Sequence, residues 1–308
     1  METGFRHEAL LYQDQGEFLD GVVPFIHEGI AGGEPVLVAL AEEKISLLER
    51  QLGADASAVR FVDMTRLGRN PARIIPVWRQ FAAAVDSDRP VRGIGEPAWP
   101  GRSDAELLEC DHHESLLNRA FAEAAGFTLL CPYDAAALVP EVLAAARRNH
   151  PELIEARERQ LSDTYLSPDA AHTPLAAPLL PPGCAPEEMG FGAGDLPTIR
   201  RFVCEQAEWA GLDRSRQADL VFSVSELAAN SIRHGGGTGT VRVWRDDLGL
   251  HCEVQDAGTL DDPLAGRARP SPSQEHGRGL WLVNQLCDLV QLRSGPAGTV
   301  TRVSMQLA

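Results

Sequence analysis

Lysine is almost missing from this sequence. Lys44 is the single lysine among 28 basic residues in a chain of 308, and neither GxxxxGKS nor GxxxxGKT occurs around it. Phosphate-binding loops of that type and protein kinases of the eukaryotic type both need a lysine at the phosphates. The shortage of lysine therefore disfavours both mechanisms.

Clusters of positive charge and long apolar segments are also missing. The formal net charge is −16 and no Lys/Arg cluster interrupts it, so the surface would repel a nucleic acid backbone. The longest purely apolar run, residues 36–41, is far shorter than the ~20 residues that span a bilayer, and the N-terminus has no signal core. We therefore expect a cytoplasmic protein that neither enters a membrane nor binds DNA directly.

Paired cysteines are absent too. The six cysteines are scattered without a CxxC pair, which is typical of reduced, buried thiols in a cytosolic chain. A zinc set drawn from Cys110, His112, His113 and Cys131 has no paired ligand spacing, so we expect no metal in this half of the chain.

Length and composition indicate two folded domains. Apolar residues make up 44% and charged residues 23% of the 308 residues, which is ordinary for a globular protein of more than one domain. Residues 7–153 alternate β-branched runs with helical patterns and predict an α/β domain with a largely parallel sheet. Residues 154–187 are rich in proline, including Pro168 and Pro174, and are the expected linker.

The remaining residues, 188–308, predict a second domain of helices and hairpins. Asp195 and Asp213 are expected to cap two successive helices. TVRVWRD and LHCEVQD, joined by DDLG, predict an antiparallel hairpin, whereas residues 280–290 suit a helix. VQLRS and TVTRVSMQL, separated by GPAG, predict a closing hairpin.

The second of these helices has the first residues suited to chemistry. Leu220, Val224, Leu227 and Ser231 share a stripe expected to face the sheet, and Glu226 and Asn230 share its flank. At ~1.5 Å of rise per residue the last two lie ~6 Å apart, so both can face one phosphate-sized site. Their oxygens suit Mg²⁺ or an attacking hydroxyl. The alternative is a solvated Glu and a capping Asn.

Two glycine-containing segments add to this pair. Asp256 and Gly258 follow a predicted strand, so a carboxylate could accept a hydrogen bond from an exocyclic amine beside a backbone that a flat ring can approach. Gly277, Arg278 and Gly279 open the next helix, whose exposed N–H groups suit phosphate. Taken singly, the first segment is also typical of a turn and the second of a loop.

The order of these segments resembles the N, G1 and G2 boxes of the GHKL ATPase superfamily, in its branch of RsbW-like anti-sigma-factor serine kinases and histidine kinases. ELAANSIRHG, DAG and GRGLWLV follow one another, and a strand beginning at Thr299 comes after them. The resemblance implies a Bergerat-fold α/β sandwich, with a mixed sheet and helices on one face, that binds ATP and Mg²⁺. One departure is Leu260, in the region where the G1 box usually has a second glycine.

The resemblance also implies a role for each matching residue. Glu226 is the general base, and Asn230 holds Mg²⁺ on the triphosphate. Asp256 binds the adenine amine and Gly258 lines the base pocket. Gly277 and Gly279 let the lid close over the phosphates, and Arg278 contacts a phosphate. Thr299 and Thr301 lie in the strand that helps to hold the aspartate.

The choice among relatives of this type depends on the phosphoacceptor. Histidine kinases have a helical hairpin with a phosphoacceptor histidine just before this domain, whereas this chain has the proline-rich segment there. RsbW-like kinases instead phosphorylate a serine of a separate, STAS-type anti-sigma-factor antagonist, which decides whether a sigma factor is held. We expect that activity. The alternatives are a non-catalytic, nucleotide-gated module that binds a sigma factor, and a histidine kinase that uses His113. A homodimer is compatible with each.

The first domain contains the segments HEALLYQDQGEFLDGVVPFIHEGIAGGEPVLVAL, GEPAW, HESLLNRAF and CPYDAAALVPEVLAAARRNHPEL. With these segments it resembles the MEDS sensory domain of DcmR-type regulators. The resemblance implies a signal-input module with a RecA-like fold that recognises an unknown small molecule or protein. Residues that could line a pocket there, or serve the structure alone, are the following polar and aromatic ones: Glu96, Trp99, His113, Glu114, Asn118, Tyr133 and Asp134.

Overall fold

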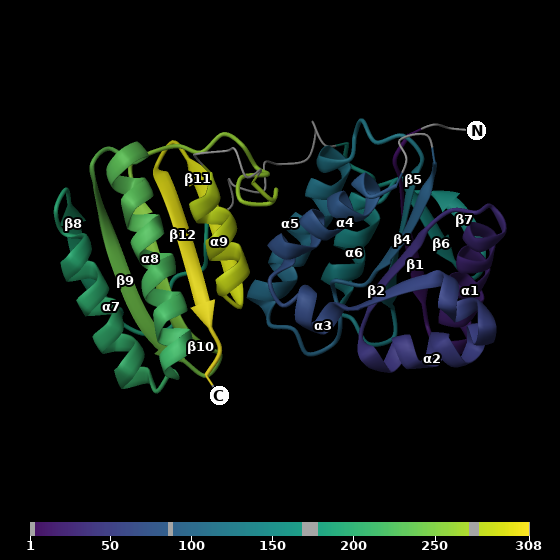
Figure 1. The fold of residues 1–308 in the computed structure, drawn as a ribbon, viewed down its shortest axis with the longest axis horizontal. Coiled ribbons are helices and arrows are strands. Elements are labelled where there is room, and N and C mark those ends of the chain that lie inside the picture. Colours follow the sequence, from purple (N-terminus) through teal and green to yellow (C-terminus); the bar gives the residue numbers. More distant parts are fainter. Residues whose placement is uncertain (1–3, 86–88, 168–177, 271–276, 308) are drawn as a thin grey trace. The chain divides into compact units, whose positions relative to one another are not determined.

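The computed structural model describes residues 4–85, 89–167, 178–270 and 277–307. The chain divides into two compact units, Met1–Ala171 and His172–Ala308, which are drawn in Figure 1. The division falls within the expected linker, 154–187. Residues 168–177 of that linker, with Pro168 and Pro174, and residues 271–276, which precede Gly277, lie outside the described residues.

The first unit contains a parallel-rich sheet, as its alternating pattern predicts. Its strand order is β3-β2-β4-β5-β1-β6-β7, and β7 pairs antiparallel with β6 while the other pairs are parallel. In chain order the strands are β1 (Arg6–Tyr12), β2 (Val36–Leu40), β3 (Val59–Asp63), β4 (Val91–Gly95), β5 (Phe127–Asp134), β6 (Glu152–Glu155) and β7 (Glu158–Leu161).

Helices cover the central strands β1, β2, β4 and β5, whose residues are mostly buried, whereas the edge strand β7 is exposed. One core joins the sheet to α1 and α2, with Phe18, Ile26 and Leu48 fully buried. Trp78 of α4 packs on β4, where a Cβ added at Gly95 would lie 2.9 Å from the indole. The helices are α1 (Gln15–Ala31), α2 (Glu42–Leu52), α3 (Met64–Leu67), α4 (Ile74–Ala83), α5 (Asp104–Ala120) and α6 (Pro140–Asn149), with 3₁₀ turns at Gly53–Ala58 and Pro71–Arg73.

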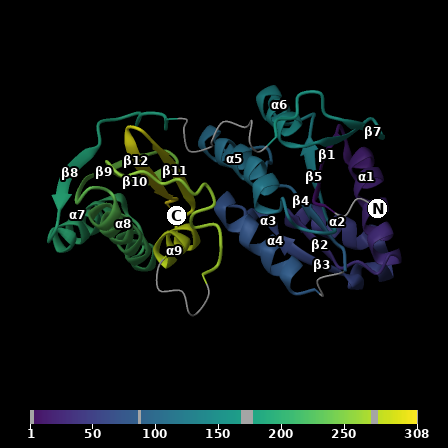
Figure 2. The same cartoon turned by 90° about the horizontal axis from the view of Figure 1, so that it is seen from above.

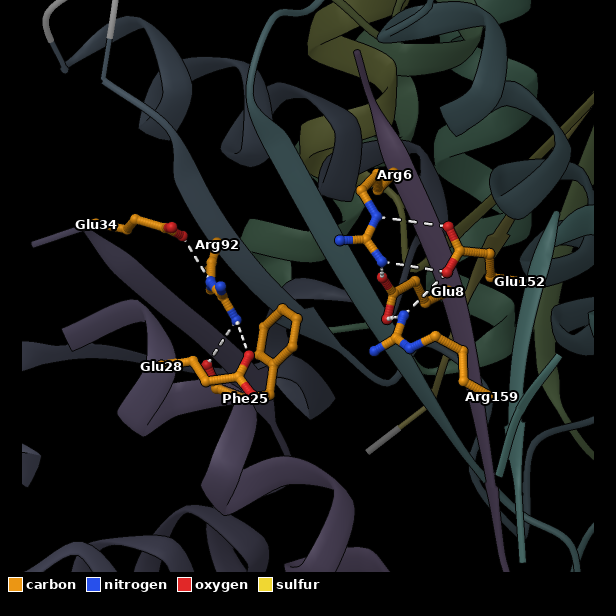
Figure 3. Close-up of polar contacts among 8 residues, drawn as sticks. All are labelled: Arg6, Glu8, Phe25, Glu28, Glu34, Arg92, Glu152 and Arg159. Atoms are coloured by element: carbon orange, nitrogen blue, oxygen red, sulfur yellow. Dashed lines mark hydrogen bonds and ion pairs between the residues drawn. The ribbon is translucent and has the colours of Figure 1, made fainter. Parts of the chain in front are cut away.

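The hairpin of β6 and β7 extends this sheet beyond residue 153, where we expected the linker to begin. Figure 3 shows the ion pairs that attach it: Arg159 of β7 lies 2.6 Å from the carboxylate of the buried Glu8 on β1. Arg6 contacts both Glu8 and Glu152. Burial would raise the pKa of Glu152, but hydrogen bonds from Arg6 and Arg159 outweigh it and lower that pKa.

A second ionic group in Figure 3 attaches the end of α1 to β4. The Arg92 guanidinium donates to Glu34 at 2.6 Å and to Glu28 at 3.1 Å, and it stacks 4.8 Å from the centre of the Phe25 ring. Because the acidic partners flank the end of α1, these contacts fix the turn that leads into β2.

The second unit contains an antiparallel sheet with helices on one face, as Figure 2 shows. We expected a mixed sheet, and this was wrong: every strand pair among the described residues is antiparallel. The reason is that two hairpins, β9–β10 and β11–β12, join along β10 and β12, and β8 adds to the edge. The strands are β8 (Glu187–Gly192), β9 (Thr238–Asp246), β10 (Gly249–Asp256), β11 (Leu289–Gly295) and β12 (Gly298–Met305).

The helices of this unit are α7 (Leu196–Ala210), α8 (Arg214–His234) and α9 (Arg278–Leu286). The stripe of α8 predicted to face the sheet is confirmed, since Leu220, Val224, Leu227 and Ser231 are all buried. Asp213 caps α8 by accepting two backbone N–H groups, whereas the Asp195 carboxylate accepts the Gly192 N–H instead of capping α7.

Helix α9 ends at Leu286, earlier than the predicted 290. The carboxylate of Asp288 accepts the Gln306 N–H at 2.8 Å and pairs with Arg216, which draws the chain into the sheet. Strand β11 therefore begins at Leu289.

Candidate functional site

A cavity of about 520 Å³ lies in the second unit, between α8, the ends of β10 and β12, and the start of α9. Its volume is within the ~300–1,000 Å³ of ligand sites. The structure brings every site residue predicted for this unit to its wall: Glu226, Asn230, Asp256, Gly258, Gly277, Arg278, Gly279, Thr299 and Thr301. Four separated segments therefore meet at one space, while the roles assigned to these residues stay predictions.

Asp256, the last residue of β10, is held by two donors from different segments. Ser231 of α8 donates its hydroxyl to Oδ2 at 2.5 Å, and the Gly258 N–H donates to Oδ1 at 2.8 Å. A carboxylate has about four acceptor positions. Asp256 is half-buried and lines the cavity, so it retains capacity for a further donor such as an exocyclic amine.

The neighbouring strand β12 supports the turn after Asp256. Thr299 lies opposite Asp256 in the β10–β12 register, and its hydroxyl donates to the Gly258 carbonyl at 2.8 Å. The Ser294 hydroxyl accepts the Leu260 N–H at 2.7 Å. Leu260 thus has a defined place in the cavity wall where the family pattern usually has a glycine.

Two glycines allow α8 and this turn to approach closely. A Cβ at Gly258 would lie 2.7 Å from Gly235 Cα and 2.8 Å from the His234 carbonyl oxygen. A Cβ at Gly235 would lie 2.3 Å from Asp256 Cγ. All three distances are too short for a Cβ without a shift of the neighbouring atoms. These positions therefore need glycine for contact between the two segments.

The start of α9 faces Glu226 across the cavity. Gly277 precedes the helix in the left-handed region, with φ of 84°, which favours glycine. A Cβ at Gly279 would lie 2.7 Å from Glu226 Oε2, so the carboxylate sits against the first turn of α9. The unpaired N–H groups of a helix start attract anions, so this end of the cavity suits phosphate.

Asn230 points its amide oxygen at a partner within α8. Arg233 donates to Asn230 Oδ1 at 3.0 Å. Because an amide oxygen that binds Mg²⁺ must face the ion, Asn230 would have to exchange this hydrogen bond for the metal. The donor set of the cavity otherwise fits a magnesium nucleotide: a carboxylate at one end, and N–H groups with Glu226 at the other.

Sequence reasoning missed Ser231, Ser294 and Gly235 as parts of this site. Ser231 was expected only to pack on the sheet, although its position directly after Asn230 was an available signal. Ser294 is brought to the site by β11 pairing with β12, and Gly235 by the close contact of α8 with the turn after β10. Local sequence contains neither of these long-range contacts.

The residues proposed to line a pocket in the first unit divide among several places. Glu114 and Tyr133 line a cavity of about 520 Å³ there. Glu96 instead accepts from Lys44 at 2.7 Å and from Tyr12 at 3.0 Å, and Asp134 accepts N–H groups of the turn that follows it.

The other three members serve packing and hydrogen bonding. Trp99 stacks 3.5 Å from the Arg102 guanidinium, and Asn118 lies 3.1 Å from His7 Nδ1. His113 is 1% exposed within α5, where a phosphoryl donor would not reach it without local opening. This burial weighs against a histidine kinase that uses His113.

Comparison with known proteins gives two family matches. Residues 6–151 match "MEDS: MEthanogen/methylotroph, DcmR Sensory domain", and residues 193–305 match "Histidine kinase-like ATPase domain". These matches confirm the resemblance of the first domain to MEDS domains and of the second to ATPase domains of the histidine kinase-like type. Among the described residues, no helix combines the length and apolar character that a bilayer crossing requires.

One solved structure to which the chain is similar comprises the RsbU and RsbW domains of Rv1364c from Mycobacterium tuberculosis. The identity is 20% and the TM-score 0.30, and the similarity covers 39% of this chain and 32% of that chain. The chain thus spans about a third of that structure. A search of curated proteins gave no match.

Proposed function

Because the chain joins an N-terminal MEDS sensory domain to a C-terminal histidine kinase-like ATPase domain, we propose that it is a sensor-regulated protein serine kinase. Its substrate would be a serine of a separate STAS-type anti-sigma-factor antagonist. The observation that supports this proposal most is the convergence of the Glu226, Asp256 and Gly277–Gly279 segments on one cavity.

Each part of the cavity suits one part of Mg²⁺-ATP. Asp256, oriented by Ser231 and Gly258, would accept from the adenine amine, while the start of α9 would receive the phosphates. Asn230 would hold Mg²⁺ after leaving Arg233. ATP supplies the transferable γ-phosphoryl group when it is bound.

Glu226 is the residue suited to move the proton. A carboxylate oxygen of Glu226 would take the proton of the incoming seryl hydroxyl. The seryl oxygen forms its bond to the γ-phosphorus as the bond to the bridging oxygen breaks, which leaves ADP. Gly279 lets Glu226 Oε2 lie against the first turn of α9, so base and phosphate-binding groups are neighbours.

The acceptor is assigned to a separate protein because none of the described residues between β7 and β8 is a histidine. The described residues 162–167 and 178–186, between β7 and β8, contain no helix that could present a phosphoacceptor. His113 is buried in the other unit. A sigma factor released or held through the antagonist is the expected target.

A second candidate function is favoured by the contact between Arg233 and Asn230. If that hydrogen bond persists with nucleotide bound, the Mg²⁺ ligand is not available. The domain would then act as a nucleotide-gated module that sequesters a sigma factor without transferring phosphate.

The experiment is phosphoryl transfer from labelled ATP to a cognate antagonist by the full chain. We expect acid-stable phosphoserine, with Glu226→Gln lowering the rate ~10²–10⁴-fold while ATP affinity changes less than about threefold. Glu205→Gln, on the exposed surface of α7, is the matched control and should transfer normally. Acid-labile labelling of the chain itself would refute the serine kinase, and ATP binding without transfer would favour the sequestering module.

A further inference from the structure

Four potential metal ligands from four separate elements meet inside the first unit. They are His7 on β1, Glu114 on α5, Cys131 on β5 and His150 directly after α6, and all four are buried. His7 Nε2 lies 3.0 Å and His150 Nε2 lies 3.3 Å from Glu114 Oε2, and Cys131 Sγ lies 3.4 Å from His7 Nε2. The ligand atoms all lie within 4.8 Å of one another.

The second nitrogen of His7 indicates which ring atom has the proton. His7 Nδ1 lies 3.1 Å from Asn118 Oδ1, and Asn118 Nδ2 donates to the Asn149 carbonyl at 2.7 Å. The carbonyl of Asn149 can only accept, so it orients the Asn118 amide with its oxygen toward His7. His7 must therefore donate from Nδ1, and its Nε2 lone pair faces the centre of the cluster.

His150 is arranged in the same way. Its Nδ1 lies 2.7 Å from the backbone carbonyl of Ala146, which also can only accept. His150 Nε2 and Glu114 Oε1 are buried, and neither atom has a hydrogen-bond partner among the described residues. Two neutral rings would thus point lone pairs at the Glu114 carboxylate, to which the Cys131 thiol donates at 3.7 Å. Such an arrangement is costly without a positive charge at its centre.

Protonation of the histidines cannot resolve this arrangement fully. The ring centroids of His7 and His150 are 3.9 Å apart, so charging both would place two cations side by side in the interior. At least one lone pair then still faces the Glu114 carboxylate. A bound cation satisfies both nitrogens, the carboxylate and the thiolate at once.

We propose that His7, Glu114, Cys131 and His150 bind one divalent transition-metal ion of the zinc type. Two imidazoles, a thiolate and a carboxylate are the donors that such ions prefer. Bonds of ~2.0–2.3 Å in a tetrahedron give ligand separations of ~3.3–3.8 Å. The contacts of 3.0, 3.3 and 3.4 Å are close to these values.

The surroundings of the cluster match those of a metal site. Metal-binding histidines usually donate their other ring N–H to a carbonyl or an amide oxygen, as His7 does to Asn118 and His150 to Ala146. Glu114 also lines the cavity of about 520 Å³ in this unit, together with Tyr133. The cluster therefore borders a space through which an ion, or a small ligand that binds the ion, can reach it.

The test is Zn²⁺ binding by the full chain, purified, stripped with a chelator and measured without nucleotide. We expect one Zn²⁺ per chain by native mass spectrometry and a competition titration. Cys131→Ser should weaken binding more than ~100-fold, and Asn118→Ala, which releases His7, ~10–100-fold. Cys110→Ser is the matched control, since Cys110 is also buried in this unit but donates to the Pro97 carbonyl. It should bind as the unchanged chain does.

Cobalt substitution keeps the test decisive if Cys131→Ser does not fold. Co²⁺ bound to the unchanged chain should show a thiolate-to-cobalt charge-transfer band and tetrahedral visible absorption. The proposal is overturned if the stripped chain binds no Zn²⁺, if Cys131→Ser and Cys110→Ser bind equally, or if the Co²⁺ complex lacks the thiolate band. In each of those outcomes the four residues form only a buried polar cluster.

Discussion

The carboxylates at the cavity of the second unit differ from fully buried carboxylates, which both units contain. In the first unit, Glu8, Glu96 and Glu114 are at most 2% exposed, and each contacts cationic or histidine side chains. Burial raises the pKa of Glu96 even though Lys44 opposes that shift. In the second unit, Glu226 and Asp256 are half-buried at the wall of a cavity.

This difference separates groups with permanent partners from groups that exchange a ligand. A buried charge is tolerated only where a partner stays with it, because desolvation is costly. A carboxylate that receives and releases a nucleotide needs free acceptor positions and access to solvent. Buried carboxylates therefore suit permanent partners, whereas the half-buried carboxylates of the second unit's cavity suit a ligand that comes and goes.

The largest expected effect comes from removing a core side chain of the first unit, which should destabilise that unit and leave the second unit unchanged. Trp78→Ala deletes a fully buried indole from the first unit and should lower its free energy of unfolding by ~3–5 kcal/mol. Denaturant unfolding of the full chain should show the first unit's transition at lower denaturant, with ATP binding retained. Trp209→Ala, at a side chain that is 71% exposed, is the control and should change little. Loss of ATP binding in Trp78→Ala would show that the second unit depends on the fold of the first, against this prediction.

A smaller effect is expected where α8 supports the cavity. Ser231→Ala removes a hydrogen bond to the Asp256 carboxylate, so ATP affinity should fall ~5–10-fold, the equivalent of ~1–1.4 kcal/mol. Ser223→Ala is the matched control, because Ser223 is buried on the same helix but donates to the Asp219 carbonyl. Equal affinities of the two variants in calorimetry would show that Ser231 does not orient Asp256.

The smallest expected effect is on how the stability of the first unit depends on pH. The pKa of Glu152 is lowered in the folded state, so its contribution to stability is present above the ordinary value of 4.5 and is lost as pH falls through the folded value. Urea midpoints of the first unit should therefore fall between about pH 5 and pH 3. Glu152→Gln should flatten that dependence, and Glu158→Gln, exposed on β7, should not. An unchanged slope in Glu152→Gln would contradict this account.

The two units also differ in how much of their candidate sites the sequence predicts. The cavity of the second unit is lined by residues of short motifs, so Glu226 with Asn230, Asp256 with Gly258, and Gly277 with Gly279 could be found from local spacing. Their meeting was predictable from a known order of segments. The two hairpins were also predictable, whereas the pairing of β10 with β12 that joins them and the support from Ser294 were not, because both depend on partners distant in sequence.

The buried cluster of the first unit has no such local pattern. His7, Glu114, Cys131 and His150 are brought together because β1 lies between β5 and β6, with α5 and α6 packed nearby. Sequence reasoning considered Cys131 with Cys110, His112 and His113, three residues of one helix that do not join it. Spacing along the chain cannot reveal ligands that sheet order assembles.

Asp256 and its neighbours are proposed to form an ATP site, and calorimetry of the full chain with Mg²⁺ and ATP tests this most directly. Asn in place of Asp256 would present an NH₂ group to donors, so Asp256→Asn should bind ATP ~10–100-fold more weakly, from ~1.5–3 kcal/mol per charged hydrogen bond. Asp247→Asn, in the exposed turn between β9 and β10, should bind as the unchanged chain does. No heat with ATP, or equal affinity in both variants, would contradict the claim.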